Sequence, residues 1–322
     1  MKKLRLLLIG IAFGLNVAMY ADEQEAFSKR VDISLSCLEE RTAFGDPVAF
    51  SLTIRNVSEL PISFFPPVNT DGLNGVIYIS EANQTQLRKV EKPRLIIGVT
   101  KGMSPPIGYD VITLAKGESK TFTFCLDYES RSLVDRVWLF PNAGHYRIKT
   151  LVFFNAKGAS GTTMPHNTAF IEIESPIVEI VVDDPLEDDK AARNDWFKRD
   201  DAWKLYAPQT YTNEKGADES LGLNAFRQRN STSRYSQFAE LCSINAAFVK
   251  GLENKDQAAM EENLKRCKEL VENKAWSAGW RCKAKDLSNI LSKYLKSFQA
   301  LRSTVNSSVE TDTPDVILAV PK

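Results

Sequence analysis

The sequence has few of the residues that most enzymes use for acid–base catalysis, since only two of its 322 residues are histidines. His145 follows a turn glycine and His166 follows a proline, each at the expected start of a strand, where a surface position is typical. The sequence also lacks Gly-x-Ser-x-Gly, His-Glu-x-x-His, Cys-x-x-Cys and Gly-x-x-x-x-Gly-Lys patterns. These are the local signals of serine hydrolases, zinc proteases, thiol redox proteins and nucleotide-binding loops. We therefore predict no catalytic residue, no metal site and no cofactor.

The charge is also too evenly spread to predict a nucleic-acid surface. Residues 22–186 carry 16 Lys/Arg against 21 Asp/Glu, and residues 187–302 carry 21 against 17. Nucleic-acid binding usually needs a clustered basic face. The acidic segment 183–189 lacks the glycine and spaced carboxylates of a calcium loop, so it is interpreted as a linker that caps a following helix.

Long apolar runs are absent after the first 21 residues. Lys2, Lys3 and Arg5 precede the apolar run 6–15, and small residues follow up to Ala21, just before a charged segment. This order is typical of a secretory signal peptide, with residues 1–21 removed from the mature chain. Met19 stands where a small residue is preferred, and an uncleaved N-terminal anchor is the alternative. We predict an exported protein, periplasmic or secreted, with no membrane span after cleavage.

Residues 27–183 show the period of β-strands. Apolar and polar residues alternate over 31–36, 48–55, 121–126, 146–150 and 171–174, and the pattern extends over 178–182. Turn residues separate these segments, including Gly45-Asp46-Pro47 and Lys116-Gly117. Period-2 alternation marks strands with one buried face. The prediction is an all-β antiparallel sandwich over 27–183.

Within this half, three segments resemble bacterial immunoglobulin-like (Ig-like) domains. They are Asp46-Pro47-Val48 with the strand that follows, the turn Leu114-Ala115-Lys116-Gly117-Glu118-Ser119, and the strand start Pro141-Asn142-Ala143-Gly144-His145-Tyr146. The resemblance spans about 31–155 and implies a fold without an activity. The intracellular proteinase inhibitor family has a similar outline, but no reactive-loop signature is present.

Residues 187–302 change to the period of helices, which predicts a second, all-α domain. Apolar residues repeat at steps of three and four from Trp280 through Leu287 and Leu291 to Leu301. The segment 248–270 resembles one tetratricopeptide-like (TPR-like) hairpin, and an ordinary helical bundle is the alternative. The chain thus resembles bacterial exported proteins with an Ig-like domain followed by a TPR-like region. Residues 303–322 are Ser/Thr-rich and are predicted to be a flexible tail.

Five cysteines are an odd number, so at least one thiol stays free or pairs between chains. In an oxidising compartment one bridge in each half is plausible. Cys37 and Cys125 are the pair available in the first half. In the second half, Cys267 and Cys282 are the best-placed pair, and Cys242 is the alternative partner.

Aromatic residues are the remaining functional lead, because Trp and Tyr often anchor interfaces as well as fill cores. The candidate interface residues are Trp196, Trp203, Trp276, Phe64 and Phe65. We predict an exported, non-catalytic adaptor that binds a protein partner not identified by the sequence. The alternatives are a proteinase inhibitor and a cell-wall or surface-polymer hydrolase whose carboxylates come from distant loops.

Overall fold

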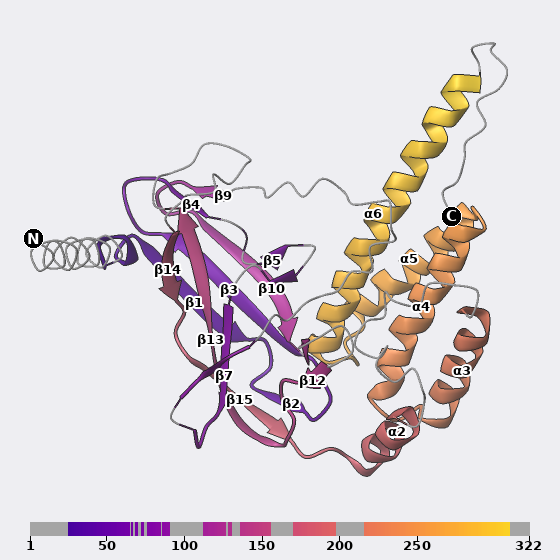
Figure 1. Ribbon diagram of the computed structural model, residues 1–322, viewed down its shortest axis with the longest axis horizontal. Coiled ribbons are helices and arrows are strands. Elements are labelled where there is room, and N and C mark those ends of the chain that lie inside the picture. Colours follow the sequence, from indigo (N-terminus) through magenta and orange to yellow (C-terminus); the bar gives the residue numbers. More distant parts are fainter. Residues whose placement is uncertain are drawn as a thin grey trace, which may run out of the picture.

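The computed structural model describes residues 25–64, 66, 68–69, 72–73, 76–84, 86–90, 112–126, 128–130, 136–155, 170–197 and 216–309. The strands and the helices occupy two sides of the molecule, and α6 rises from the junction between them (Figure 1). The predicted signal peptide 1–21 lies outside the described residues.

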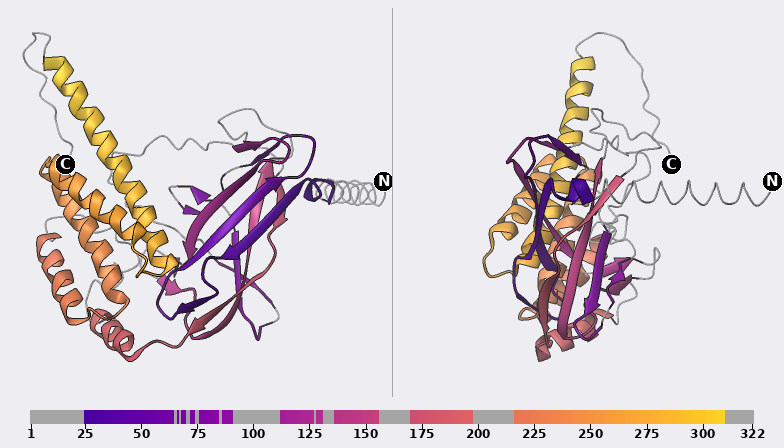
Figure 2. Two further views of the ribbon diagram at one scale, coloured as in Figure 1. Left: turned by 180° about the vertical axis from the view of Figure 1, so that it is seen from behind. Right: turned by 90° about the vertical axis from the view of Figure 1, so that its left-hand side faces the viewer.

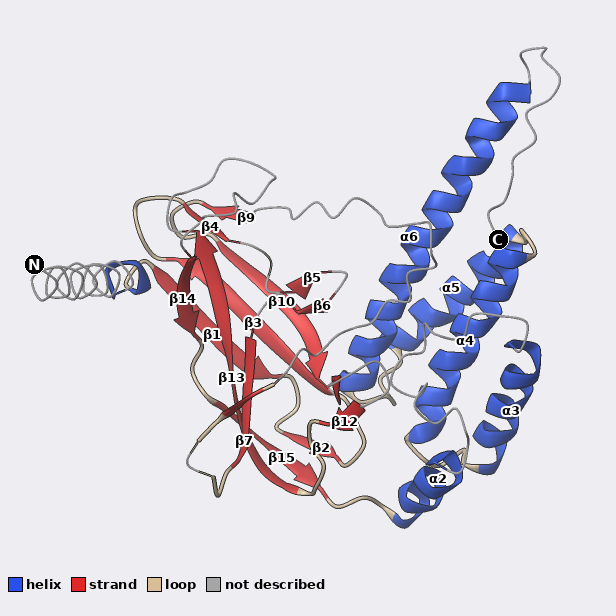
Figure 3. Cartoon of the chain, viewed as in Figure 1, coloured by secondary structure: helices blue, strands red, loops and turns tan. Residues whose placement is uncertain are grey.

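Two sheets make up the strand side, as the red arrows of Figure 3 show. The smaller sheet has the order β1-β3-β10 and is antiparallel. The larger follows the order β2-β15-β13-β4-β9, with β14 and β7 also pairing with β13 and β8 pairing with β7. The bounds are β1 Val31–Cys37, β2 Arg41–Ala43, β3 Val48–Asn56, β4 Ile62–Phe64, β7 Val76–Glu81, β8 Arg88–Lys89, β9 Ile112–Leu114, β10 Ser119–Leu126, β13 Gly144–Asn155, β14 Phe170–Glu174 and β15 Val178–Asp183.

Two short ribbons complete the strand side. They pair β5 (Val68–Asn69) with β6 (Gly72–Leu73) and β11 (Tyr128–Ser130) with β12 (Arg136–Trp138).

The apolar core of the strand side lies between the two sheets, which face each other in the right-hand view of Figure 2. Along β1 the burial alternates strictly, so Val31, Ile33 and Leu35 face inward. Rings from the two sheets meet directly, because Phe64 of β4 and Phe122 of β10 have centroids 6.1 Å apart. The period-2 alternation of the sequence is therefore the pattern that fills this core.

The helices form the second side, with bounds α2 Glu187–Phe197, α3 Gly216–Arg229, α4 Tyr235–Glu253, α5 Gln257–Glu272 and α6 Ala278–Val309. From α3 to α6 each helix packs on the next, around one apolar core that includes Phe226, Phe248 and Trp280. The Asp256 side chain caps α5 by accepting a 3.0 Å bond from Ala259 N. Among the described helices, none combines the length and apolar character needed to cross a bilayer.

The predicted fold class, an all-β sandwich plus an all-α domain, is wrong, because the described residues form a mixed α/β structure. Two findings overturn it. The larger sheet is mixed, since β2 runs parallel to β15, and α6 packs directly on β3 and β10. The structure supports neither an Ig-like sandwich nor TPR-like hairpins. Periodicity reports which face of an element is buried and does not report which distant element covers it.

The C-terminal end also differs from the prediction of a tail beginning at 303. Residues 303–309 continue α6 without a break. Residues 310–322 lie outside the described part of the chain.

Candidate functional site

The first turn of α6 lies against the turn that precedes β3, and small residues make this approach possible. A Cβ atom added to Gly279 would lie 1.6 Å from the carbonyl oxygen of Pro47. Ala49, Cys125, Ala278 and Cys282 form a small buried cluster beside it. The side chain of Glu39 accepts a 2.6 Å hydrogen bond from Ala278 N, so the strand side also caps α6. We call this region the strand–helix junction.

Asp46 is the polar centre of the junction. Its carboxylate is buried and accepts hydrogen bonds from Trp280 Nε1 at 2.8 Å and from Arg234 Nη1 at 2.9 Å. Burial raises the pKa of Asp46 to about 6, although Arg234 and Trp280 both act to lower it. Desolvation therefore outweighs the two donors. One aspartate from the strand side thus holds the starts of both α4 and α6.

Arg234 also joins Asp46 to a second buried acid. Asp189 of α2 accepts 2.9 Å hydrogen bonds from Ser233 Oγ and from Arg234 N, and lies 3.4 Å from Arg234 Nε. Both carboxylates are nearly inaccessible, with side chains 3% and 2% exposed. A cation shared by two buried acids costs a great deal to remove, because an unpaired charge would stay behind.

Tyr235 packs into the same network. Its hydroxyl is buried and no partner for it is found among the described residues, and burial raises the pKa of Tyr235. The hydroxyl lies 3.0 Å from where a Cβ atom of Gly45 would stand, and Gly45 has a φ of +89°. A glycine is needed here both for the left-handed backbone and for the space that the tyrosine fills.

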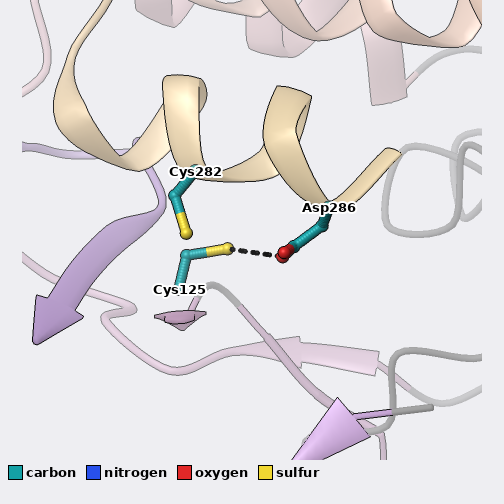
Figure 4. Close-up of side chains that lie close together, drawn as sticks. All are labelled: Cys125, Cys282 and Asp286. Atoms are coloured by element: carbon teal, nitrogen blue, oxygen red, sulfur yellow. Dashed lines mark hydrogen bonds between the residues drawn. The ribbon is translucent and has the colours of Figure 1, made fainter. Parts of the chain in front are cut away.

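A group of three ligand-type side chains lies next to this network. The sulfur atoms of Cys125 and Cys282 and a carboxylate oxygen of Asp286 all lie within 4.8 Å of one another (Figure 4). Cys125 Sγ donates to Asp286 Oδ2 at 3.7 Å. A hydrogen bond with Cys282 and burial together raise the pKa of Cys125. We call these residues the thiol–carboxylate cluster.

The structure places the cysteines differently from the predicted pairs. None of the five cysteines forms a disulfide, so neither Cys37 with Cys125 nor Cys267 with Cys282 or Cys242 is joined. Cys37 donates to Glu39 O at 2.8 Å, and Cys267 donates to Ala284 O at 3.2 Å inside the helical core. Cys282 instead faces β10, where it lies beside Cys125 (Figure 4).

The predicted interface aromatics do not come together on one described surface. Phe64 is fully buried in the strand core and Trp276 is 9% exposed in the helical core. Trp196 belongs to α2, but its side chain lies outside the described residues, as do Phe65 and Trp203. Core packing accounts for the two side chains that are described.

Of the two histidines, His145 alone belongs to the described part of the chain. His145 lines a surface hollow of about 300 Å³ with Glu81, Asn83 and Asn142, and His166 lies outside the described residues. Sequence reasoning missed Asp46, Arg234 and Asp286. Asp46 stood in an ordinary turn motif, and no local spacing connects residues that are 188 positions apart.

Comparisons with known proteins assign no family. No family model matches the sequence, and no curated protein matches it. A mutant β-glucosidase from Listeria innocua in complex with laminaribiose is similar over 48% of this chain, with 16% identity and a TM-score of 0.25, and only 16% of the glucosidase is covered.

Two smaller structures are similar at the same level. The sporulation control protein Spo0M from Bacillus subtilis matches 52% of this chain and 55% of its own, with 8% identity and a TM-score of 0.26. The structural genomics target SoR45 matches 47% and 85%, with 11% identity and a TM-score of 0.24. At such TM-scores the likenesses carry neither a fold family nor an activity to this chain.

Proposed function

We propose that the chain is an exported, non-catalytic adaptor that binds an acidic segment of a partner protein along α6. The proposal is based on the length of α6, which extends beyond the helices that cover it. At 32 residues, α6 is about 48 Å long, whereas α5 has only 16 residues. Figure 1 shows α6 extending past the ends of α4 and α5.

The apolar stripe of α6 passes from covered to open along its length. Leu287 and Leu291 are buried in the helical core, Phe298 is partly buried, and Leu301 is 54% exposed. The start of α5 lies beside this end of the stripe, because Arg302 Nη1 of α6 donates a 3.5 Å hydrogen bond to Gln257 Oε1 of α5. An apolar helix face that becomes exposed where its covering helix ends is a typical docking surface for a partner helix.

The exposed side of α6 is basic, which favours an acidic partner. Lys285, Lys293 and Lys296 are all exposed, at helical steps of eight and three that keep them on one side. Between residues 278 and 302, α6 carries six Lys/Arg and one Asp. Charges of this kind increase association rates and select partners of opposite sign. We call the exposed segment of α6 that carries Lys293, Lys296 and Leu301 the α6 docking face.

Chemical crosslinking in the native extracytoplasmic compartment tests the proposal, with the intact chain as bait. We expect one acidic protein to be retained by the wild-type chain and lost with Lys293→Glu/Lys296→Glu/Leu301→Asp. Lys274→Glu is the matched control, since Lys274 is exposed in the turn before α6 and away from the docking face. Retention that is equal in the triple variant, or retention of no protein by the wild-type chain, contradicts the proposal.

A further inference from the structure

The thiol–carboxylate cluster has the donor atoms of a metal site that no local sequence pattern predicts. Cys282 and Asp286 are four residues apart on α6, so their side chains lie on one face of the helix. Cys125 lies near the end of β10 and meets them from the strand side (Figure 4). Two thiols and one carboxylate therefore converge from elements that are 157 positions apart in sequence.

The spacing of the three ligand atoms is close to that around a small metal ion. They lie within 4.8 Å of one another. Zinc bonds of about 2.0 to 2.3 Å in a tetrahedron put neighbouring ligand atoms about 3.5 to 3.8 Å apart. Small shifts about the side-chain torsions are enough to close this difference. The other members of the buried cluster, Ala49 and Ala278, have short side chains.

Charge balance also favours a divalent ion. Bound as two thiolates and one carboxylate, the ligands carry three negative charges, which would be costly in a buried position without compensation. The ammonium group of Lys283 lies near enough to act on Cys125. A divalent ion would supply two positive charges beside this lysine and so lower the cost of burying the three ligands.

We propose that Cys125, Cys282 and Asp286 bind one divalent ion of the zinc class. Thiolate ligands select borderline and soft ions such as Zn²⁺, Co²⁺ and Cd²⁺ over Mg²⁺ and Ca²⁺. Three protein ligands leave one coordination position for water or for a donor from another molecule. The ion joins β10 to α6 and thereby ties the strand side to the helix side. This site is independent of the α6 docking face.

Cobalt titration of the reduced, intact chain under anaerobic conditions tests the site, because Co²⁺ reports thiolate ligands by near-ultraviolet charge-transfer absorption. We expect one equivalent of Co²⁺ to bind and Zn²⁺ to displace it. Losing a residue that hydrogen-bonds to a metal ligand weakens metal binding by about 10- to 100-fold. Cys282→Ala removes a ligand itself, so it should weaken Co²⁺ binding by at least about 100-fold. Cys37→Ala is the matched control, since Cys37 lies on β1 outside the cluster.

Asp286→Asn keeps the proposal testable if the cysteine variants do not fold. Asp286 is only half-buried and asparagine has the same shape, so the variant should fold while its Co²⁺ affinity falls by about 10-fold or more. Binding that survives Cys282→Ala, or that disappears equally in Cys37→Ala, overturns the proposal. So does a wild-type chain that binds no Co²⁺ after full reduction of its thiols.

Discussion

The close approach of Gly279 to Pro47 allows a sharp test of the strand–helix junction. In Gly279→Ala the new Cβ atom would lie 1.6 Å from the carbonyl oxygen of Pro47 and 2.5 Å from its carbonyl carbon. These are backbone atoms, so no side-chain rotation relieves the overlap. Either the turn before β3 or the first turn of α6 has to move.

Two opposing effects set the size of the change. Alanine stabilises a helix by at most about 1 kcal/mol relative to glycine. Overpacking costs about 1 to 3 kcal/mol, and an overlap this deep belongs at the upper end. The steric cost wins, so we expect Gly279→Ala to lower the free energy of unfolding by about 2 kcal/mol.

Urea unfolding followed by circular dichroism measures this change, with Gly251→Ala as the matched control. Gly251 lies in α4, where a Cβ atom would meet its nearest neighbour, Met260 Cγ, at 3.2 Å. That methionine side chain can move by a few tenths of an ångström, and the backbone oxygen of Asp256 at 3.3 Å is a far milder contact than the overlap at Gly279. The control should therefore change stability by less than about 1 kcal/mol. A Gly279→Ala protein as stable as the wild type, or more stable, would show that α6 does not lie on this turn.

Three further predictions concern the buried network at the same junction. Because the pKa of Asp46 is raised from 3.8 to about 6, its contribution to stability is complete only below the unfolded-state pKa of 3.8 and is lost as the pH rises through 6. Relative to Asp46→Asn, the wild type should lose about 2 kcal/mol between pH 4 and pH 7, measured by urea unfolding at each pH. Arg234→Ala should destabilise by about 3 kcal/mol because it leaves Asp46 and Asp189 buried without their cation, whereas Arg229→Ala breaks an exposed pair and should cost less than about 1 kcal/mol in the same assay. Trp280→Phe removes the 2.8 Å hydrogen bond to Asp46 and should cost about 1 to 3 kcal/mol by thermal unfolding.

Each of these has a clear opposite result. A wild type that gains stability relative to Asp46→Asn as the pH rises would mean that the pKa of Asp46 is lowered. If Arg234→Ala and Arg229→Ala lowered the free energy of unfolding equally, the ion pairs of Arg234 would be as solvent-exposed as that of Arg229. If Trp280→Phe left the stability unchanged, a water molecule would have replaced the indole N–H as the donor to Asp46.

The sequence predicts the individual elements well where the period is regular. The alternation over 31–36 corresponds to β1, and that over 48–55 corresponds to β3. The apolar steps from Trp280 to Leu301 fall within one helix, and the acidic residues at 187–189 begin α2 as expected. These features depend on local geometry, which the sequence encodes directly.

The junction could not be predicted from the same patterns. Asp46 stands in a Gly-Asp-Pro turn, and nothing nearby indicates that it binds Arg234 and Trp280. Cys267 and Cys282 stand at similar distances from the turn between α5 and α6, which favours pairing them, but Cys282 lies in the junction cluster and Cys267 in the helical core. The elements that meet across a junction are selected by complementary shape and by small residues. The role of Gly279 is an example, because it becomes visible only once Pro47 is known to lie against it.

Site-specific photocrosslinking from residue 301 is the most direct measurement of the proposed adaptor role. A photoreactive amino acid would replace Leu301 in the intact chain, and the same group at position 274 would serve as the control. We predict that an acidic protein of the extracytoplasmic compartment crosslinks from position 301 and not from 274, and that the yield falls with added salt. Equal crosslinking from both positions, or none from 301, would contradict the proposal that α6 binds a partner.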